Sequence, residues 1–416
     1  MLHVSDCLVW LIAVGSILCV LMQPRGWAEA WWACGGALLL VVTTLVPWSQ
    51  AVASVRQGLD VYLFLTGMMI LSELAREKGV FDWIAEEAAI HAAGSPRRLF
   101  FLIYLSGTAV TALLSNDATA VVLTPAVLTI VRRLKIEPVP HLLACALIAN
   151  AASFVLPISN PANLVIYGNH MPPLVTWLRA FFLPSLVSIV LTFASLRFVT
   201  RENLRGDIGV SLPKTKLSTD GRLAMAGLGL AAFVLIGASA LGWPLGAPTC
   251  AAALLASLIV TCRDRTVPRA IVRGVAWSVL PLVAGLFVIV GALQNAGGLR
   301  LAVAGLDAAR NLAPVVANLV TAFSVGLLSN VMNNLPVGLI GGRAVQVAHD
   351  HGSLAHAVLI GVDLGPNLSV TGSLATILWL VALRRENVKI SGRKFFTVGL
   401  VVMPIALLGS ILVLGK

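Results

Sequence analysis

Long apolar runs recur from one end of the chain to the other. Ten of them have about the length that an α-helix needs to cross a bilayer, roughly twenty residues. They lie at 6–23, 28–47, 59–78, 140–168, 173–197, 221–241, 245–262, 276–296, 353–383 and 393–414. Because these runs fill most of the chain, the pattern predicts an all-α integral membrane protein with ten transmembrane helices.

Two further apolar stretches, 99–134 and 313–348, are interrupted by polar residues in the middle. The polar residues of the two interruptions are Ser115, Asn116 and Asp117 in the first, and Ser329, Asn330, Asn333 and Asn334 in the second. Each stretch is either two full spans or a re-entrant hairpin with its tip inside the bilayer. A polar tip at membrane depth must lie in protein or beside a cavity, which favours the two hairpins.

Basic residues gather in short loops between the apolar runs, at 132–135, 197–222, 263–273 and 384–394. When ten spans and two hairpins are traced along the chain, all of these loops fall on one side. Positive charge marks cytoplasmic loops, so we expect this side to be cytoplasmic and both termini to lie outside. The first apolar run lacks a basic leader and a cleavage site, and it is therefore expected to be the first span.

The two halves of the chain show a weak internal repeat. An offset of 218 positions pairs Gly67 with Gly285 and Gly79 with Gly297, and it places the first hairpin tip on the second. Each half then holds five spans and one hairpin. Because five is odd, the halves insert in opposite orientations, as the inverted repeats of secondary transporters do. The predicted organisation is a first half at 1–200, a cytoplasmic linker at 201–220 and a second half at 221–416.

Composition excludes several classes of function. Hydrophobic residues make up 58% of the chain and charged residues only 11%, whereas a soluble domain has about 25% charged residues. The net charge of +11 lies in loops, so no basic patch on a soluble domain exists for nucleic acid. Six scattered cysteines without a C-x-x-C pair argue against a metal site or disulfide framework. No Walker motif is present, so we expect a transporter without a cofactor and not an enzyme.

Four polar, Gly- and Pro-interrupted stretches lie at membrane depth. They are the hairpin tips at 113–125 and 328–342 and two interrupted spans around 155–168 and 361–379. Proline frees backbone carbonyls, and Asn, Ser and Thr offer donors and acceptors to a small hydroxylated solute. Single polar residues often only join helices to one another. Four such stretches in matching positions of two halves favour a substrate site.

Few ionisable residues lie at depth. Asp117 and Asp363 are the candidate proton-coupling residues, because a carboxyl inside a membrane is costly when charged and is usually functional. The alternative for Asp363 is a cap of the helix that follows Gly365 and Pro366. Glu73 is expected to be structural, as part of a surface pair with Arg76 and Lys78. The last two residues follow it on the same face of a predicted helix.

The four stretches resemble the ArsB family of arsenite/antimonite efflux permeases, within a larger superfamily of inverted-repeat ion carriers. The resemblance rests on the motifs SNDATAVVLTP, ANAASFVLPISNPANLVIYG, SNVMNNLPVGLIGG and GVDLGPNLSVTGSLATILWL. It covers nearly the whole chain, and the last motif is the most specific. Asn150 stands in the second motif as an amide, so no second proton site is implied there.

The resemblance implies export of trivalent arsenic and antimony hydroxides (arsenite and antimonite) in exchange for protons, across the cytoplasmic (inner) membrane of a prokaryote. Some members of that family also dock a separate cytoplasmic ATPase. Carried over by residue, the substrate site comprises Ser115, Asn116, Ser159, Asn160, Asn163, Asn333, Asn334, Gly372, Ser373 and Thr376. Asp117 and Asp363 are the proton-coupling residues, and the metalloid is cargo and not a resident metal.

The residue chemistry agrees with this reading but leaves an alternative open. Trihydroxy-arsenic is neutral and needs hydroxyl and amide partners, and no Lys or Arg falls inside the four stretches. The same oxygens also suit a Na⁺/H⁺ antiporter or a Na⁺-coupled anion carrier of the same fold. A gated channel is disfavoured, because interrupted inverted repeats are typical of carriers.

Overall fold

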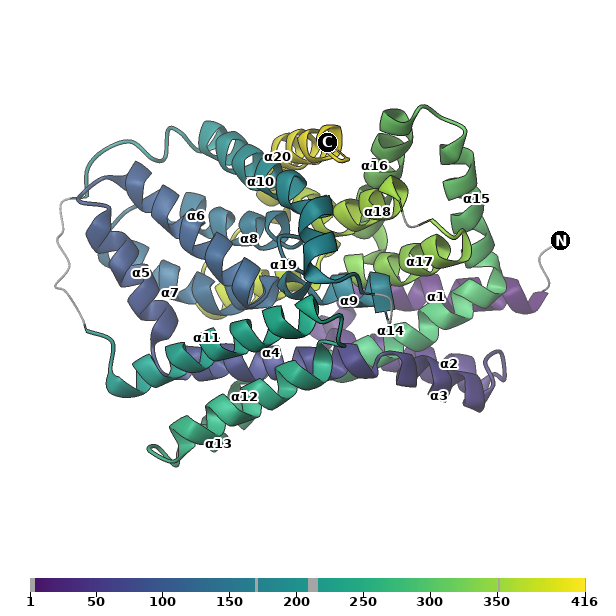
Figure 1. Cartoon of the computed structure of the whole chain (residues 1–416), viewed down its shortest axis with the longest axis horizontal. Helices are drawn as coiled ribbons and strands as arrows, with labels where there is room; N and C mark the ends of the chain where they lie inside the picture. The colour runs from purple at the N-terminus through teal and green to yellow at the C-terminus, as the bar shows by residue number, and fades with distance from the viewer. Residues whose placement is uncertain (1–3, 169–170, 209–215, 351, 416) are drawn as a thin grey trace.

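The computed structural model describes residues 4–168, 171–208, 216–350 and 352–415, and within them every regular element is helical (Figure 1). Residues 209–215 of the predicted linker therefore lie outside the described residues. The helices of the first half are α1 (Val4–Met22), α2 (Glu29–Val42), α3 (Trp48–Gln57), α4 (Leu59–Glu77), α5 (Val80–His91), α6 (Pro96–Leu113), η2 (Ala118–Leu123), α7 (Thr124–Arg133), α8 (Val139–Ala151), η3 (Pro157–Ser159), α9 (Pro161–Tyr167) and α10 (Leu174–Val199).

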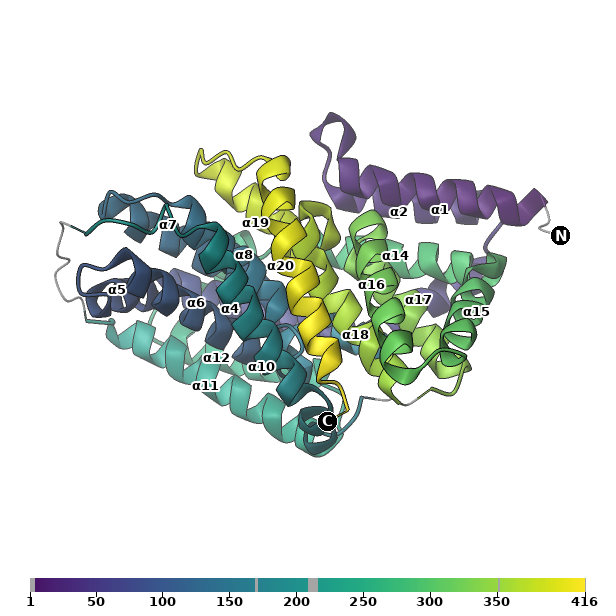
Figure 2. The same ribbon diagram turned by 90° about the horizontal axis from the view of Figure 1, so that it is seen from above.

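The second half follows the same order of long and interrupted helices. Its elements are α11 (Thr219–Ala240), α12 (Gly246–Thr261), α13 (Val267–Gly274), α14 (Val279–Leu293), η5 (Gln294–Gly298), α15 (Leu299–Arg310), α16 (Pro314–Met332), α17 (Asn334–Val347), α18 (Ser353–Leu364), η6 (Gly365–Leu368), η7 (Val370–Gly372), α19 (Leu374–Arg385) and α20 (Gly392–Leu412). The last helices of the two halves, α10 and α20, pack side by side (Figure 2).

Membrane-spanning helices account for much of the chain. Six helices in the described part are long and apolar enough to cross a bilayer, and α3 with α4 makes a seventh if this pair, bent by 48°, is one span. Three shorter apolar helices, α2, α8 and α12, coincide with other predicted spans. The chain is therefore an all-helical, multi-pass membrane protein. The count of ten spans and two hairpins stays a prediction.

The glycines that define the repeat occupy matching places in the fold. A Cβ on Gly67 of α4 would lie 2.7 Å from the backbone of Thr249 in α12, and one on Gly285 of α14 would lie 2.7 Å from the backbone of Ala33 in α2. Each of these glycines allows a close helix crossing between the halves. The other two, Gly79 and Gly297, have φ of 70° and 96°, a conformation that favours glycine. In each half, one glycine allows a close helix crossing and the other adopts a positive φ.

The loops predicted to be cytoplasmic contact one another at one end of the molecule. Nζ of Lys78, after α4, lies 2.6 Å from Oδ2 of Asp264, after α12, and Nε of Arg263 lies 3.0 Å from Oδ1 of Asp220 at the start of α11. Figure 1 shows α5, α7, the start of α11 and α13 at this same end. The gathering of basic loops that the positive-inside rule requires is therefore present in the fold.

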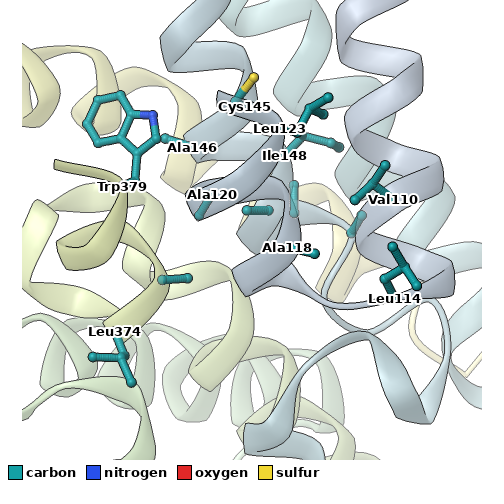
Figure 3. Close-up of a cluster of buried hydrophobic side chains, with 14 of the residues drawn as sticks. Val110, Leu114, Ala118, Ala120, Leu123, Cys145, Ala146, Ile148, Leu374 and Trp379 are labelled. Atoms are coloured by element: carbon teal, nitrogen blue, oxygen red, sulfur yellow. The ribbon is translucent and has the colours of Figure 1, made fainter. Parts of the chain in front are cut away.

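The first interrupted stretch, α6 to α7, begins and ends at that end of the molecule. The carbonyl of Gly94, before α6, accepts from the amide of Ile208 in the linker, and Arg133 at the end of α7 pairs with Glu86 of α5. Between these points, α6 packs against α8, and η2 packs against α8 and α19. Figure 3 shows the apolar side chains of this contact, among them Val110, Leu114, Leu123, Ile148 and Trp379. The polar tip is thereby fixed inside the protein.

Candidate functional site

Both long interrupted spans are broken over segments of equal length. The first break separates the end of α8 at Ala151 from the start of α9 at Pro161, and the second separates Leu364 of α18 from Leu374 of α19. Only short 3-10 turns occur inside them. After each break a polar residue precedes the next helix. In the first, Oδ1 of Asn160 accepts from the amide of Ala162 at 3.0 Å and so caps α9.

The two hairpin tips are held by their own polar side chains. Oγ of Ser115 accepts from the amide of Ala118 at 3.2 Å, and Oδ1 of Asn116 accepts from the amide of Asp117 at 2.9 Å. In the second tip Asn333 has a φ of 73°, and its Oδ1 accepts from the amide of Leu335. Its Nδ2 donates to the carbonyl of Thr371, which ties this tip to the second break.

All four stretches meet at one small cavity, the centre of the candidate site. Its polar lining comes from Asn116 and Asp117 of the first tip, Asn160 after the first break, Asn334 of the second tip and Ser373 after the second break. Its volume is about 10 Å³, which is room for about one water molecule. The structure thus brings together the segments that the sequence places far apart, with the centre closed around them.

Hydrogen bonds cross between the two breaks. Nδ2 of Asn160 donates to Oδ1 of Asp363 at 2.7 Å, which joins the start of α9 to the end of α18. In the other direction, Nδ2 of Asn150 at the end of α8 lies 3.0 Å from Oδ1 of Asn367 and 3.2 Å from Oγ1 of Thr376. Each half therefore supplies a polar partner to the break of the other half.

Four buried acceptor oxygens around these contacts have no hydrogen-bond partner among the described residues. They are Oδ1 of Asn150, Asn163 and Asn334 and Oδ2 of Asp363. Buried polar atoms are nearly always paired, so unpaired acceptors here call for a donor or a cation. A protonated carboxyl or a solute bearing hydroxyl groups supplies such donors.

Two larger cavities flank the centre. One, of about 150 Å³, lies between α4, the first hairpin, the start of α14 and α19, and its polar and charged lining includes Ser115, Asp117, Glu73 and Arg385. The other, of about 440 Å³, lies between α14, the second hairpin, the start of α4 and α9. Exchanging the two halves converts one set of elements into the other. Under the predicted repeat the two cavities correspond to each other, and Asp117 lines both the smaller one and the centre.

The larger cavity is the more polar of the two. Its polar and charged lining residues are Gln50, Ser54, Gln57, Asp60, Gln294, Asn295, Arg343 and Gln346. One cation lines each cavity, Arg385 in the smaller and Arg343 in the larger, whereas the described residues around the centre include no Lys or Arg. A neutral solute meets no fixed counter-charge at the centre itself.

The other predicted site residues lie behind the central cavity and shape it. Oγ of Ser159 donates to the carbonyl of Ala112 in α6, which joins the first hairpin to the first break. Nδ2 of Asn163 donates to the carbonyl of Ser153 at 2.9 Å and holds the first break in place. A Cβ on Gly372 would lie 2.6 Å from Cα of Pro366, so the second break is folded tightly on itself.

Three further polar residues, which are not among the predicted site residues, join the second tip to the second break. Oδ1 of Asn330 accepts from Oγ of Ser369 at 2.6 Å, and its Nδ2 donates to the carbonyl of Gly365 at 2.9 Å. Oγ1 of Thr371 donates to the carbonyl of Asn330. These residues lie inside the motifs shared with the arsenical permeases, so the sequence indicated the segments. Which polar residues contact each other depends on the fold.

The alternative role of Asp363 and the expectation for Glu73 both need correction. Asp363 is not a helix cap: it lies in the last turn of α18, the residue before α19 is Ser373, and the carboxyl bonds to Asn160 instead. Glu73 does pair with Arg76, at 2.8 Å between Nε and Oε2. It is nevertheless buried and lines the smaller cavity, and Lys78 pairs with Asp264 and not with Glu73. Asp363 and Lys78 therefore bind partners from the other half.

Known proteins place this architecture among membrane transporters. The sequence model of the CitMHS family, described as citrate transporters, matches residues 17–362. The chain belongs to the CitMHS family. It is also 30% identical over 413 residues to the arsenical pump membrane protein of Escherichia coli (strain K12), with 94% of each chain covered. The corresponding protein of Yersinia enterocolitica is 28% identical over 403 residues, again with 94% of each chain covered. The resemblance to the arsenical permeases, inferred from the motifs, is confirmed.

Further comparisons agree with a transporter fold. An uncharacterized transporter of Mycobacterium tuberculosis is 27% identical over 411 residues, covering 89% of this chain and 90% of its own. The crystal structure of the Alcanivorax borkumensis YdaH transporter matches with a TM-score of 0.56 at 16% identity, covering 88% of this chain and 87% of that one. This CitMHS member therefore shares the fold of a solved membrane transporter.

Proposed function

We propose that this chain exports trivalent arsenic and antimony hydroxides across the cytoplasmic membrane of a prokaryote in exchange for protons. The observation that carries the proposal is the central cluster, where four interrupted stretches from both halves converge without a Lys or Arg among the described residues. Its amides, hydroxyls and unpaired buried acceptors suit a small neutral solute with several hydroxyl groups. Similarity to arsenical pump membrane proteins over nearly the whole chain supports the same substrate class.

The family description raises citrate as a competing cargo. Citrate carries several negative charges, and a site for it would call for cations or many aligned donors. Here the two cations that line the cavities, Arg385 and Arg343, lie in separate flanking cavities and not at the centre. The centre is lined by amides, one hydroxyl and the carboxyl of Asp117, and it offers a citrate no cation among the described residues. A neutral metalloid hydroxide fits this chemistry better.

Transport requires the centre to open. A cavity of about 10 Å³ holds no more than about one water, so a trihydroxy metalloid enters only when the hairpin tips and the interrupted helices separate. The two flanking cavities are the expected entrance and exit, because they approach the centre as counterparts from the two halves. Protons are carried by Asp363, with Asp117 placed between the smaller cavity and the centre. In this scheme the loops gathered around Lys78 and Asp264 face the cytoplasm and both termini lie outside.

Everted membrane vesicles test the proposal directly. When a proton gradient is imposed with the vesicle interior acidic, vesicles that contain the protein are expected to accumulate arsenite and antimonite, and not arsenate or citrate. Cells expressing the protein should tolerate arsenite, and arsenate only when a reductase is also present. Vesicles that accumulate Na⁺ but not arsenite would transfer the assignment to the Na⁺/H⁺ antiporter alternative. A separate ATPase partner is tested by repeating the assay with ATP and cytosol.

A further inference from the structure

Asn150 and Asp363 occupy the same position in the two halves of the fold. Each is the residue before the last of the helix that precedes a break: α8 ends at Ala151 and α18 ends at Leu364. The helices that follow begin at Pro161 and Leu374, so an offset of 213 positions takes the end of α8 to the end of α18 and the start of α9 to the start of α19. The same offset takes 150 to 363.

Both residues also make a hydrogen bond to the other half, although the offset of 213 pairs Asn160 with Ser373 and not with Thr376. Asp363 receives its hydrogen bond from Asn160, the residue that caps α9 in the first half. Asn150 donates to Thr376, in the first turn of α19 in the second half. Each side chain therefore crosses from its own half to the start of the helix after the break in the other half.

Burial and pairing complete the correspondence. Both residues are 0% exposed, and each keeps one side-chain oxygen without a partner among the described residues, Oδ1 in Asn150 and Oδ2 in Asp363. The two side chains have nearly the same shape. They differ in that one position holds an acid and the other an amide.

We propose that positions 150 and 363 are equivalent sites for a single carboxyl, and that the coupling proton can be carried at either one. Asn150 is then the positioning residue that holds Asn367 and Thr376 while Asp363 titrates. A protonated aspartate at 150 donates its O–H to Oδ1 of Asn367, as the amide does now at 3.0 Å. An asparagine at 363 still accepts from Nδ2 of Asn160 through its Oδ1. This inference rests on the proposed proton-coupled export.

Four proteins test it: the wild type, Asp363→Asn, Asn150→Asp, and the exchanged double variant Asn150→Asp/Asp363→Asn. Asp363→Asn is expected to lose proton-driven arsenite uptake because no carboxyl remains in the pair. Asn150→Asp is expected to be impaired because two carboxyls are then buried in one cluster. The double variant should transport at least about 5-fold faster than either single variant, which corresponds to a coupling of roughly 1 kcal/mol.

A matched control places the same new acid outside the cluster. Asn318 in α16 is buried and also has an unpaired Oδ1 within the described part of the chain, and it lines none of the three cavities described above. Asn318→Asp combined with Asp363→Asn should therefore recover nothing. Recovery in this control as large as in the exchanged variant would overturn the proposal, as would an inactive exchanged variant that is folded and monodisperse.

Transport assays test the proposed function, and melting temperatures test this inference independently of the substrate. If the wild type moves no arsenite, the substrate assignment is wrong. The melting temperatures of the same four purified proteins still test the pair, because they need no substrate. Asn150→Asp should lower the melting temperature, and adding Asp363→Asn should restore at least part of the loss. Purely additive changes in melting temperature would contradict a shared site.

Discussion

The carboxyl of Asp363 and the amide of Asn160 form a 2.7 Å hydrogen bond between residues 203 positions apart. The bond joins the last turn of α18 in one half to the residue that caps α9 in the other. The same Asn160 side chain caps α9 through its Oδ1, which accepts from the amide of Ala162. One residue thus positions both a helix start and the only fully buried carboxyl among the described residues. Any rearrangement of the two breaks must change the surroundings of this carboxyl.

Asp363→Asn is expected to insert and fold but to lose proton-driven arsenite uptake. The substitution keeps the acceptor for Asn160 and the size of the side chain, and it removes the group that changes charge. The measurement is uptake into everted vesicles at matched protein content, with circular dichroism to verify folding. Uptake at the wild-type rate would show that Asp363 does not carry the proton.

Asp117→Asn is expected to slow proton-driven uptake by roughly 10-fold while leaving some transport. Asp117 is partly exposed and lines both the centre and the smaller cavity, so it lies on the path between them. Losing one general acid–base group on a proton path costs about 10²–10⁴-fold when it is essential and less when water can replace it. Rates across a series of proton gradients measure the effect. Unchanged rates throughout the series would exclude Asp117 from the path.

Gly365→Ala is expected to destabilise the protein by about 1–3 kcal/mol, as overpacking of an interior does. A Cβ at this position would lie 2.3 Å from Cα of Gly326, where α16 of the second hairpin crosses the start of the second break. Gly305→Ala in α15 is the matched control, since no atom lies within 4 Å of its added Cβ. Thermal unfolding in detergent should rank the control at or above the wild type and Gly365→Ala well below both.

Lys78→Met is expected to lower the melting temperature at neutral pH and to lower it less at acidic pH. The Lys78 ammonium, helped by the hydroxyl and amide of Thr266, holds the pKa of Asp264 below its usual range. A pKa that is lower in the folded state means that the contact stabilises above the unfolded pKa of about 3.9 and that this stability is lost as the pH falls below it. The difference in melting temperature between wild type and variant should be constant from about pH 6 to 8 and narrow below about pH 4.

The matched control for this pair is Lys389→Met. Lys389 belongs to the same group of basic loops, but it is exposed and has no ion pair within the described residues. Its substitution should leave the melting temperature unchanged at every pH. A pH-independent effect of Lys78→Met would indicate that the lysine acts through its packed methylene groups and not through its charge.

The sequence determined the membrane character, the helical class and the location of the polar stretches. These follow from local properties: about twenty apolar residues in a row can satisfy their backbone inside a bilayer only as a helix. The four glycines of the predicted repeat each have a local reason, because close helix crossings and positive φ both favour glycine, while the repeat itself stays a prediction.

Only the tertiary structure decided which polar atoms meet. Local reasoning paired Lys78 with Glu73 and left a helix cap open as the alternative role for Asp363, yet both residues bind partners about 200 positions away, Asp264 and Asn160. Asn150 gave no sign that it would contact Asn367 and Thr376. A side chain reaches whatever the packing of the two halves brings within about 3 Å. That packing is set by many helix contacts at once, so no local pattern along the chain contains it.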